Sequence, residues 1–280
     1  MNNANAATLK KQCIDLKKKV IRMVYKAQSG HPGGSLSAAD FVTALYFREM
    51  NLDPQNPNWE DRDRFVLSKG HVCPIQYAAL ATRGYFDVSE LDTLRQEGSK
   101  LQGHPDMNKC PGIDISTGSL GQGLACAVGM GIAAKKDHKD YRVFAVLGDG
   151  ECQEGEIWEA AQTAYKYQLD NLIVFVDNNN LQIDGICDEV MPNIDLGKKF
   201  AAFGFETYEI NGNDMEEILK TLDKIKMTKN GKPKCIFAHT IKGNGVSYME
   251  NKCSWHGTAP NKEQYKQAIT ELDAQLSMIL

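Results

Sequence analysis

The sequence predicts an α/β fold in which a mostly parallel sheet is covered by helices on both faces. Short apolar runs of strand character alternate with helical patterns along the chain, and this alternation is typical of parallel sheets. The 280 residues are 42% hydrophobic, which is enough for a sizeable buried core. No repeat and no long Pro/Gly/Ser linker marks an internal boundary, so we expect residues 1–280 to form a single domain.

The first predicted element is an amphipathic helix near the N-terminus. Apolar residues recur at helical spacing from Leu9 to Val24, and lysines and an arginine fall between them. We interpret these basic residues as the solvated face of the helix. A nucleic-acid surface is not expected, because the whole chain has 32 Lys and Arg against 36 Asp and Glu. Residues 51–59 are rich in Pro and Asn and are predicted to form a surface loop.

Three apolar runs are predicted as strands, over residues 142–147, 172–177 and 235–241, and residues 64–68 are a fourth candidate. Residues 154–167 have helical spacing, so the first two runs form a strand-helix-strand crossover. The predicted apolar face of this helix consists of Ile157, Trp158, Ala161, Ala164 and Tyr165. Residues 121–134 contain many small side chains, which predicts a deeply buried helix that packs closely on its neighbours. Residues 262–280 are predicted to form a last helix with one apolar stripe.

The cysteine pattern and the absence of long apolar runs indicate the compartment. The eight cysteines include no C-x-x-C pair and mostly lie beside apolar residues, so we interpret them as reduced core thiols. No H-x-x-x-H spacing occurs either, and a structural zinc site is not expected. The N-terminus has no apolar signal region, and no run of about 18 apolar residues could span a membrane. We therefore expect a cytoplasmic protein with no membrane contact.

Polar residues follow two of the predicted strands. Gly148, Asp149 and Gly150 come directly after residues 142–147, and Asn179 follows the next run. Ligands in open parallel sheets lie at the carboxyl ends of strands, so these residues should converge. One carboxylate, one amide oxygen and a nearby backbone carbonyl form an oxygen-only site that needs more oxygens from a diphosphate, which is how Mg²⁺ or Ca²⁺ is held. The glycines let backbone N–H groups approach the phosphates.

GDG at 148–150 followed by NN at 178–179 is similar to the thiamine diphosphate motif, and other segments resemble transketolases in particular. These segments are KAQSGHPGG at 26–34, SKGH at 68–71, GHP at 103–105, STGSLGQG at 116–123 and SWHG at 254–257. The resemblance implies a thiamine diphosphate-binding fold, with thiamine diphosphate and Mg²⁺ (or Ca²⁺) as cofactors. One departure is Gly33-Gly34, where the family often has Ser or Thr, so a hydroxyl contact to the cofactor is lost.

The resemblance also assigns roles position by position. Its metal ligands are Asp149, Asn179 and the backbone carbonyl of Leu181. Its cofactor-binding residues are His71, Gly118, Leu120, Gly150, Asn179, Lys242 and His256. Its substrate-binding residues are His31, His104 and His256, and its catalytic residues are His31, His71, His104, His256 and Glu154. Glu154 and Glu159 are glutamates that the family places at a subunit interface.

Transketolases move a two-carbon ketol unit from a ketose to an aldose, and this chemistry explains the histidines. A base must act on a donor hydroxyl, and the growing negative charge needs hydrogen-bond donors nearby. Imidazoles that titrate near neutral pH suit both tasks.

The resemblance implies a partner as well. In this family a glutamate from a second domain on the opposing subunit protonates the cofactor's aminopyrimidine ring, and this sequence contains no such second domain. We therefore expect the N-terminal subunit of a split transketolase, paired with a separate C-terminal subunit in an α2β2 assembly and acting on sugar phosphates. A chain cut from a longer transketolase would have the same pattern. We also expect weak or no cofactor binding by the chain alone.

Two other classes of function fit part of the pattern. The chain could be a subunit of another two-chain thiamine diphosphate enzyme, of the 2-oxo acid dehydrogenase or deoxyxylulose phosphate synthase type. The G-H-x-G-G segment at 30–34 also occurs in the latter. It could instead be a cofactor-binding module without catalysis, although a pure binder does not need the four histidines. A ketose phosphate donor, which has no carboxylate, distinguishes a transketolase from the decarboxylating enzymes.

Overall fold

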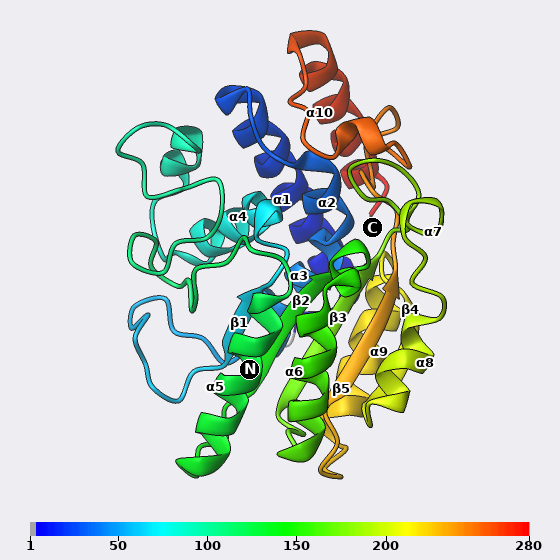
Figure 1. Cartoon of the computed structure of the whole chain (residues 1–280). Coiled ribbons are helices and arrows are strands. Elements are labelled where there is room, and N and C mark those ends of the chain that lie inside the picture. Colours follow the sequence, from blue (N-terminus) through cyan, green and yellow to red (C-terminus); the bar gives the residue numbers. More distant parts are fainter. Residues whose placement is uncertain (1–3, 280) are drawn as a thin grey trace.

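The computed structural model describes residues 4–279 and contains a five-stranded parallel sheet (Figure 1). The strands lie in the order β1-β2-β3-β5-β4. Their bounds are β1 Arg64–Leu67, β2 Val143–Gly148, β3 Leu172–Asn178, β4 Glu206–Asn211 and β5 Lys234–His239. The predicted α/β class and all four predicted strands are confirmed, whereas β4 has no counterpart in the sequence prediction. Residues 1–3 and 280, the ends of the predicted domain, lie outside the described residues.

Helices cover both faces of the sheet, as the sequence predicts. Their bounds are α1 Ala6–Ala27, α2 Pro32–Ser37, α3 Ala39–Ala44, α4 Cys73–Arg83, α5 Gln122–Lys136, α6 Gly155–Lys166, α7 Cys187–Val190, α8 Leu196–Ala202, α9 Met215–Lys226 and α10 Lys262–Ser277. One apolar core lies between the sheet and the layer of α1, α3, α4, α9 and α10. A second core lies between the sheet and α5, α6 and α8, which are in front of the strands in Figure 1.

The crossover from β2 through α6 to β3 forms because the apolar pattern of each segment matches the burial that its place in the fold requires. All but the last residue of each strand is buried, which is typical of a parallel sheet covered on both faces. Ile157, Ala161 and Ala164 form the buried stripe of α6, as predicted. Tyr165, which was expected on this face, is exposed and lies over Gly204 instead.

Helix α1 is amphipathic as predicted, but one of its lysines is not solvated. Lys17 is buried, and its ammonium lies 3.1 Å from a carboxylate oxygen of Asp40 in α3. The Lys17 ammonium also donates to Asn244 Oδ1 (2.5 Å). The prediction of a solvated basic face is therefore wrong at this position, because Asp40 supplies the buried partner that an ammonium requires.

Helix α5 packs as closely as its small residues predict, but on one face only. A methyl group on Gly123 would lie 2.6 Å from Ser68 Cα, so only glycine lets the helix approach the end of β1. Gly129 on the opposite face is exposed. The expectation of deep burial for this whole segment is thus corrected to burial of one face.

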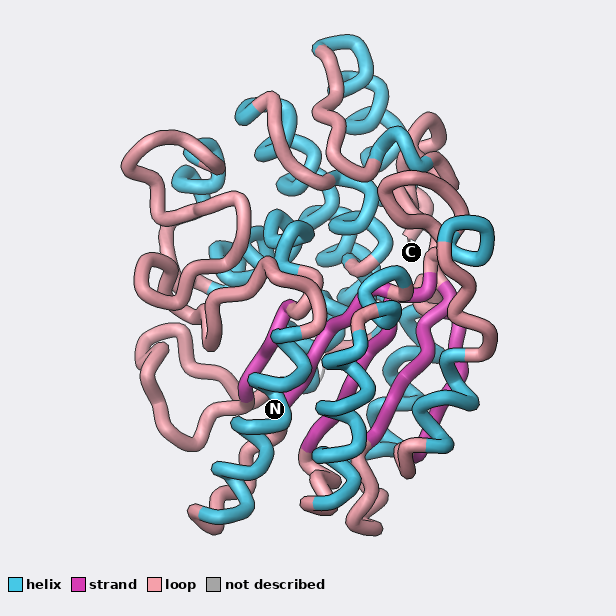
Figure 2. Tube along the Cα trace, in the orientation of Figure 1, coloured by secondary structure: helices cyan, strands magenta, loops and turns pink. Residues whose placement is uncertain are grey.

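The carboxyl ends of the strands support most of the loops and short helices (Figure 2). Among them are the turns η2 Gly70–Val72, η4 Gly150–Gln153 and η5 Cys253–Trp255. All eight cysteines are free, and six of them are buried, in agreement with reduced core thiols. Within residues 4–279, no helix combines the length and the apolar character that crossing a membrane requires.

Candidate active site

The two polar motifs after β2 and β3 meet, as the sequence predicts. Gly148 of β2 pairs with Asp177 of β3, and the Asp149 N–H donates to the Asp177 carbonyl (3.3 Å). The Asp149 carboxylate accepts hydrogen bonds from the N–H groups of Gly150 (2.8 Å) and Asn180. The side chains of Asp149 and Asn179 therefore lie at one edge of the sheet, above the same pair of strands.

Asp149 is held in an environment that opposes its charge. Burial and the nearby Asp177 carboxylate raise the pKa of Asp149 to about 6, although the two N–H donors act in the opposite direction. A buried carboxylate without a cationic partner is a costly group, and a divalent cation would relieve this cost.

Asp177 connects four elements beneath the site. Its carboxylate accepts hydrogen bonds from Ser37 Oγ of α2 (2.5 Å) and from the Thr240 hydroxyl after β5. It also forms a fully buried ion pair with Lys69, which follows β1. The amide of Asn179 lies 3.5 Å away. This arrangement fixes the position of Asn179 relative to α2 and the ends of β1 and β5.

Lys242 reaches the same region from the loop after β5. Its ammonium donates to the Leu181 carbonyl (2.9 Å) and lies 3.0 Å from His256 Nδ1. Lys242 is buried, and within residues 4–279 it forms no ion pair with a carboxylate. Burial and the charge of Lys69 lower its pKa. A buried ammonium of this kind fits an anionic ligand, and a diphosphate would supply the missing charge.

Three of the four predicted histidines form a compact cluster. The ring centroids of His31 and His71 are 5.1 Å apart, those of His71 and His256 are 5.1 Å apart, and those of His31 and His256 are 5.4 Å apart. His104 comes from another loop and lies against Gly118, where a methyl group would be 3.1 Å from the imidazole. Gly118 has φ +151°, a conformation that favours glycine.

The pKa values of all four histidines are lowered in this environment, which corrects the expectation of titration near neutral pH for His31, His71 and His256. Burial and Arg95 lower the pKa of His31 to about 4, and burial and Lys242 lower that of His256 to about 3. Burial and Lys69 lower the pKa of His71 well below its usual value, and the pKa of His104 is lowered by burial and Arg95. At pH 7 all four imidazoles are therefore neutral in the ligand-free chain.

A cavity of about 380 Å³ brings the predicted residues together. All twelve predicted site residues line it: His31, His71, His104, Gly118, Leu120, Asp149, Gly150, Glu154, Asn179, Leu181, Lys242 and His256. Glu154 is exposed at the start of α6, whereas Glu159, one turn further along the helix, does not line the cavity. No group of three or more His, Cys, Asp or Glu within residues 4–279 could hold a metal ion without further ligands.

The sequence prediction assigns no role to three residues that line the cavity or contact its histidines. Lys69 pairs with Asp177, and Arg95 lies beside His31 and Gly103. Glu151 is buried and accepts hydrogen bonds from the Gly121 N–H (2.9 Å), the Gly148 N–H (3.0 Å) and the Ser68 hydroxyl. The local hints are the position of Lys69 within the SKGH segment and that of Glu151 directly after the GDG motif, whereas Arg95 has none.

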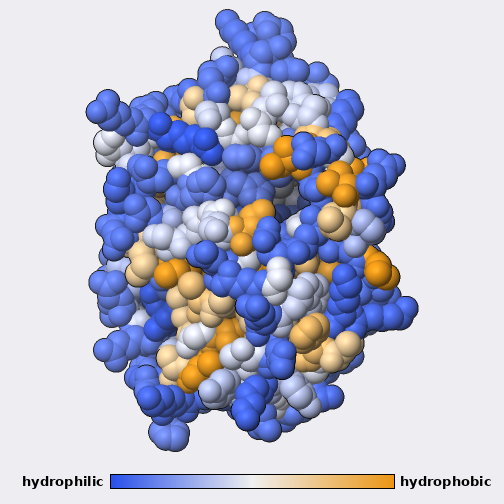
Figure 3. All heavy atoms as spheres, viewed as in Figure 1, coloured by the Kyte–Doolittle hydropathy of each residue, from blue (hydrophilic) through white to orange (hydrophobic). Residues whose placement is uncertain are grey.

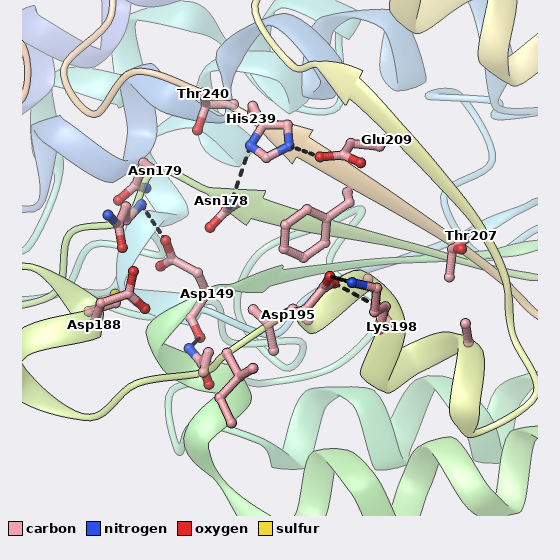
Figure 4. Close-up of a pocket in the computed structure, with 18 of the residues that line it drawn as sticks. Asp149, Asn178, Asn179, Asp188, Asp195, Lys198, Thr207, Glu209, His239 and Thr240 are labelled. Atoms are coloured by element: carbon pink, nitrogen blue, oxygen red, sulfur yellow. Dashed lines mark hydrogen bonds and ion pairs between the residues drawn. The ribbon is translucent and has the colours of Figure 1, made fainter.

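A second, larger cavity, of about 890 Å³, also borders Asp149 and Asn179 (Figure 4). It is lined by the ends of β3, β4 and β5 and by residues 193–198. His239 lines this cavity, with Nε2 2.6 Å from Glu209 Oε1 and Nδ1 3.2 Å from the Asn178 amide (Figure 4). None of the four predicted histidines lines it. The smaller cavity therefore contains the predicted chemistry.

Comparison with known proteins identifies the family. The family model described as "Transketolase, thiamine diphosphate binding domain" matches residues 10–276. A subunit of the apulose-4-phosphate transketolase of Phocaeicola vulgatus is 43% identical, and the alignment covers 97% of this chain and 96% of that protein. The 6-deoxy-6-sulfo-D-fructose transketolase subunit SqwG of a Clostridium species is 45% identical, with 95% and 97% covered. The chain belongs to the transketolase family.

A solved structure of the transketolase from Campylobacter jejuni superposes with a TM-score of 0.89 at 38% identity. The match covers 95% of this chain but 42% of the Campylobacter chain, so this chain spans about two-fifths of that transketolase. It spans almost the full length of the two subunits named above. The expected thiamine diphosphate-binding fold is thus confirmed.

The residues present fit the cofactor that this transketolase domain implies. Asp149, Asn179 and the Leu181 carbonyl offer oxygen ligands alone, too few for a closed metal site, so a metal ion would take its remaining ligands from a diphosphate. The buried Lys242 ammonium, which lacks a counter-ion among the described residues, faces the same space.

Proposed function

We propose that this chain is the N-terminal, thiamine diphosphate-binding subunit of a split transketolase. The assembled enzyme moves a two-carbon ketol unit from a ketose phosphate to an aldose phosphate. The chain acts as one domain over residues 1–280 and is active only with a separate C-terminal subunit. The observation on which the proposal rests is the single cavity that brings the oxygen ligands, the buried Lys242 ammonium and four neutral histidines together.

Cofactor binding would use the oxygen ligands and the Lys242 ammonium that line the cavity. Asp149, Asn179 and the Leu181 carbonyl would hold Mg²⁺ or Ca²⁺ together with the diphosphate, and Lys242 would neutralise part of the phosphate charge. Gly150 would offer its backbone to the phosphates. When bound, thiamine diphosphate supplies a nucleophilic carbon and an electron sink for cleaving the bond next to the ketose carbonyl.

The histidines that line the same cavity would act on the sugar. A neutral imidazole offers one N–H donor and one lone pair, so it can donate to a carbonyl oxygen or accept from a hydroxyl. His31, His104 and His256 would bind the sugar oxygens, and His71 and His256 would also contact the cofactor. Gly118 and Leu120 would line its aminopyrimidine end. Because the cluster is neutral, these residues can orient the sugar without repelling the metal ion.

The substrate class follows from the relatives. One is named for apulose 4-phosphate and another for 6-deoxy-6-sulfo-D-fructose. We infer that this chain also serves sugars that end in an anionic group, either a phosphate or a sulfonate.

The proposed partner would cover the outer side of the cavity. Leu120 and Ile183 line this cavity and are 38% and 68% exposed. Met191 and Ile194 follow on the same segment and are 57% and 86% exposed. Apolar atoms are visible in this region of the surface, around α7 (Figure 3). An apolar patch beside a ligand cavity is typical of a protein interface. The subunits named in the relatives support such a partner, and we propose an α2β2 assembly.

Two glutamates of α6 are proposed for the same interface. Glu154 lies at the rim of the cavity, and Glu159 is exposed on the next turn of the helix. Between two copies of this chain, they would connect the two cofactor sites.

The test is ketol transfer from xylulose 5-phosphate to ribose 5-phosphate with thiamine diphosphate and Mg²⁺. The chain is assayed alone and mixed with the product of the adjacent reading frame, and sulfonated sugars are assayed in parallel. We expect activity only in the mixture, and we expect Asp149→Asn to assemble normally but to be inactive. Transfer by the chain alone would exclude the two-chain model. Turnover of 2-oxo acids instead of ketose phosphates would assign the chain to the decarboxylating enzymes.

A further inference from the structure

The Arg95 side chain connects the two loops that contain His31 and His104. Its Nη1 donates to Ser29 Oγ (3.1 Å), two residues before His31. Its Nη2 donates to the Gly103 carbonyl (3.4 Å), next to His104, and lies 3.5 Å from His31 Nδ1. The segments 29–31 and 103–104 are far apart in sequence, and the guanidinium lies between them.

The backbone conformation of Arg95 is energetically unfavourable, and a turn holds the residue in it. Arg95 has φ +59°, a left-handed conformation that costs a non-glycine residue about 1 kcal/mol. Its N–H donates to the Leu101 carbonyl (2.9 Å), which closes the turn over residues 95–101. A methyl group on Gly103 would lie 2.9 Å from Arg95 Cζ, so the glycine of the GHP segment makes room for the guanidinium.

The charge of Arg95 is not neutralised by a carboxylate within residues 4–279. The neighbouring acids are already paired, because Glu90 binds Lys100 and Asp92 binds Arg22 and Lys26. The positive charge therefore acts on the adjacent imidazoles. The titratable groups that face His31 are Arg95, His71, His104, Lys242 and His256, and none of them is acidic.

The chemistry of the guanidinium decides which nitrogen of His31 has the proton. Arginine has five N–H donors and no acceptor, so a ring nitrogen that faces it must present a lone pair. His31 Nδ1 is that nitrogen, and in a neutral ring the proton is then on Nε2. Within the described residues, His31 Nε2 has no hydrogen-bond partner, which leaves this N–H for a ligand in the cavity.

We propose that Arg95 is a positioning residue that joins the His31 and His104 loops and fixes His31 as the neutral Nε2–H tautomer. His31 then acts as a hydrogen-bond donor to a substrate oxygen and not as a base at Nε2. The lowered pKa of His31 agrees with this, since burial and Arg95 both disfavour the imidazolium. Only the identification of that oxygen as a sugar oxygen rests on the proposed function.

The tautomer can be measured directly in the full chain by ¹⁵N-histidine NMR. The chain has six histidines, and the spectrum of His31→Gln identifies the His31 signals. We expect the Nε2–H pattern at pH 7 in the wild type, with no protonation down to about pH 5. In Arg95→Met we expect a mixture of tautomers and a titration midpoint higher by about one pH unit. Lys100→Met is the control, because Lys100 lies in the same turn but pairs with Glu90, and its spectrum should match the wild type.

Arg95→Lys separates charge from geometry and remains informative if the methionine variant folds poorly. Lysine retains the cation, so the His31 midpoint should stay low, but its ammonium cannot join both loops. In the assembled enzyme we expect kcat/KM for ketol transfer to fall about 10- to 100-fold in Arg95→Met and by less in Arg95→Lys. An Nδ1–H tautomer in the wild type, or a tautomer unchanged in Arg95→Met, would overturn the proposal. So would wild-type kcat/KM in Arg95→Met. Absence of any ketol transfer would contradict the proposed function only, because the NMR result stands without it.

Discussion

Replacing Asp149 by asparagine should stabilise the ligand-free chain while abolishing the proposed metal site. The folded-state pKa of Asp149 is about 6 against the ordinary 3.8, so the folded chain binds the proton more tightly than the unfolded chain. The stability that this group contributes at low pH is lost as the pH rises from about 4 to about 6. At pH 7 the buried charge costs about 3 kcal/mol. Asparagine has no charge but offers one carbonyl oxygen to two N–H donors, which costs about 1–2 kcal/mol. The net gain is about 1–2 kcal/mol.

Thermal unfolding without metal or cofactor, from pH 4 to pH 8, measures this gain. At pH 7 we expect Tm of Asp149→Asn to exceed the wild-type value by about 2–6 °C. At pH 4 the difference should shrink, because the wild-type carboxyl is then protonated. Mg²⁺ with thiamine diphosphate and the partner should raise the wild-type Tm only. Asp188→Asn, which removes an exposed carboxylate of α7, is the control and should show no such pH dependence. If Asp149→Asn is less stable than the wild type at every pH, the argument from burial is refuted.

Three further substitutions test the support of the site. Lys69→Met leaves the Asp177 carboxylate buried without its ion pair, and urea unfolding should show a loss of about 3 kcal/mol, whereas an unchanged midpoint would contradict a fully buried pair. Glu151→Gln removes one acceptor from the three donors that Glu151 binds, so a loss of about 1–3 kcal/mol is expected in thermal denaturation. Gly123→Ala should destabilise by about 1–3 kcal/mol, because the methyl meets the Ser68 backbone. The exposed Gly129→Ala in the same helix should stabilise by about 1 kcal/mol, and equal effects of the two in urea unfolding would refute the packing argument.

The strands that the sequence predicts are those with buried apolar runs. β2 and β3 are covered on both faces, so nearly every residue is apolar and the pattern is unmistakable. β4 is one of the two edge strands, and Ile210 is its only buried residue. Its sequence, ETYEIN, therefore has no apolar run to identify it. β1 lies at the other edge but has three buried apolar residues, so the exposed side chains of β4, and not its edge position or weak pairing with β5, explain why it is missed.

In the site, too, the sequence predicts the residues that are placed by their local position and misses the contacts between distant segments. Gly148 ends β2, and Asp149 and Asn179 directly follow β2 and β3, so their convergence follows from the parallel topology. Arg95 and His31 are joined by a contact across 64 residues, and no local spacing indicates it. The protonation states of the histidines also depend on burial and on cations from other loops, which is why an expectation drawn from the ordinary histidine pKa is wrong here.

The strand order has a consequence for how this chain is made. β4 is synthesised before β5 but joins the sheet only through β5, so on the ribosome it must wait unpaired until the later strand emerges. The unit of β2, α6 and β3 can form much earlier, with Asp149 and Asn179 already adjacent. Lys242 and His256 follow β5 in the chain. A nascent chain would therefore acquire the proposed metal-binding edge first and the complete histidine cluster last, so a prematurely released chain would have the edge without the cluster.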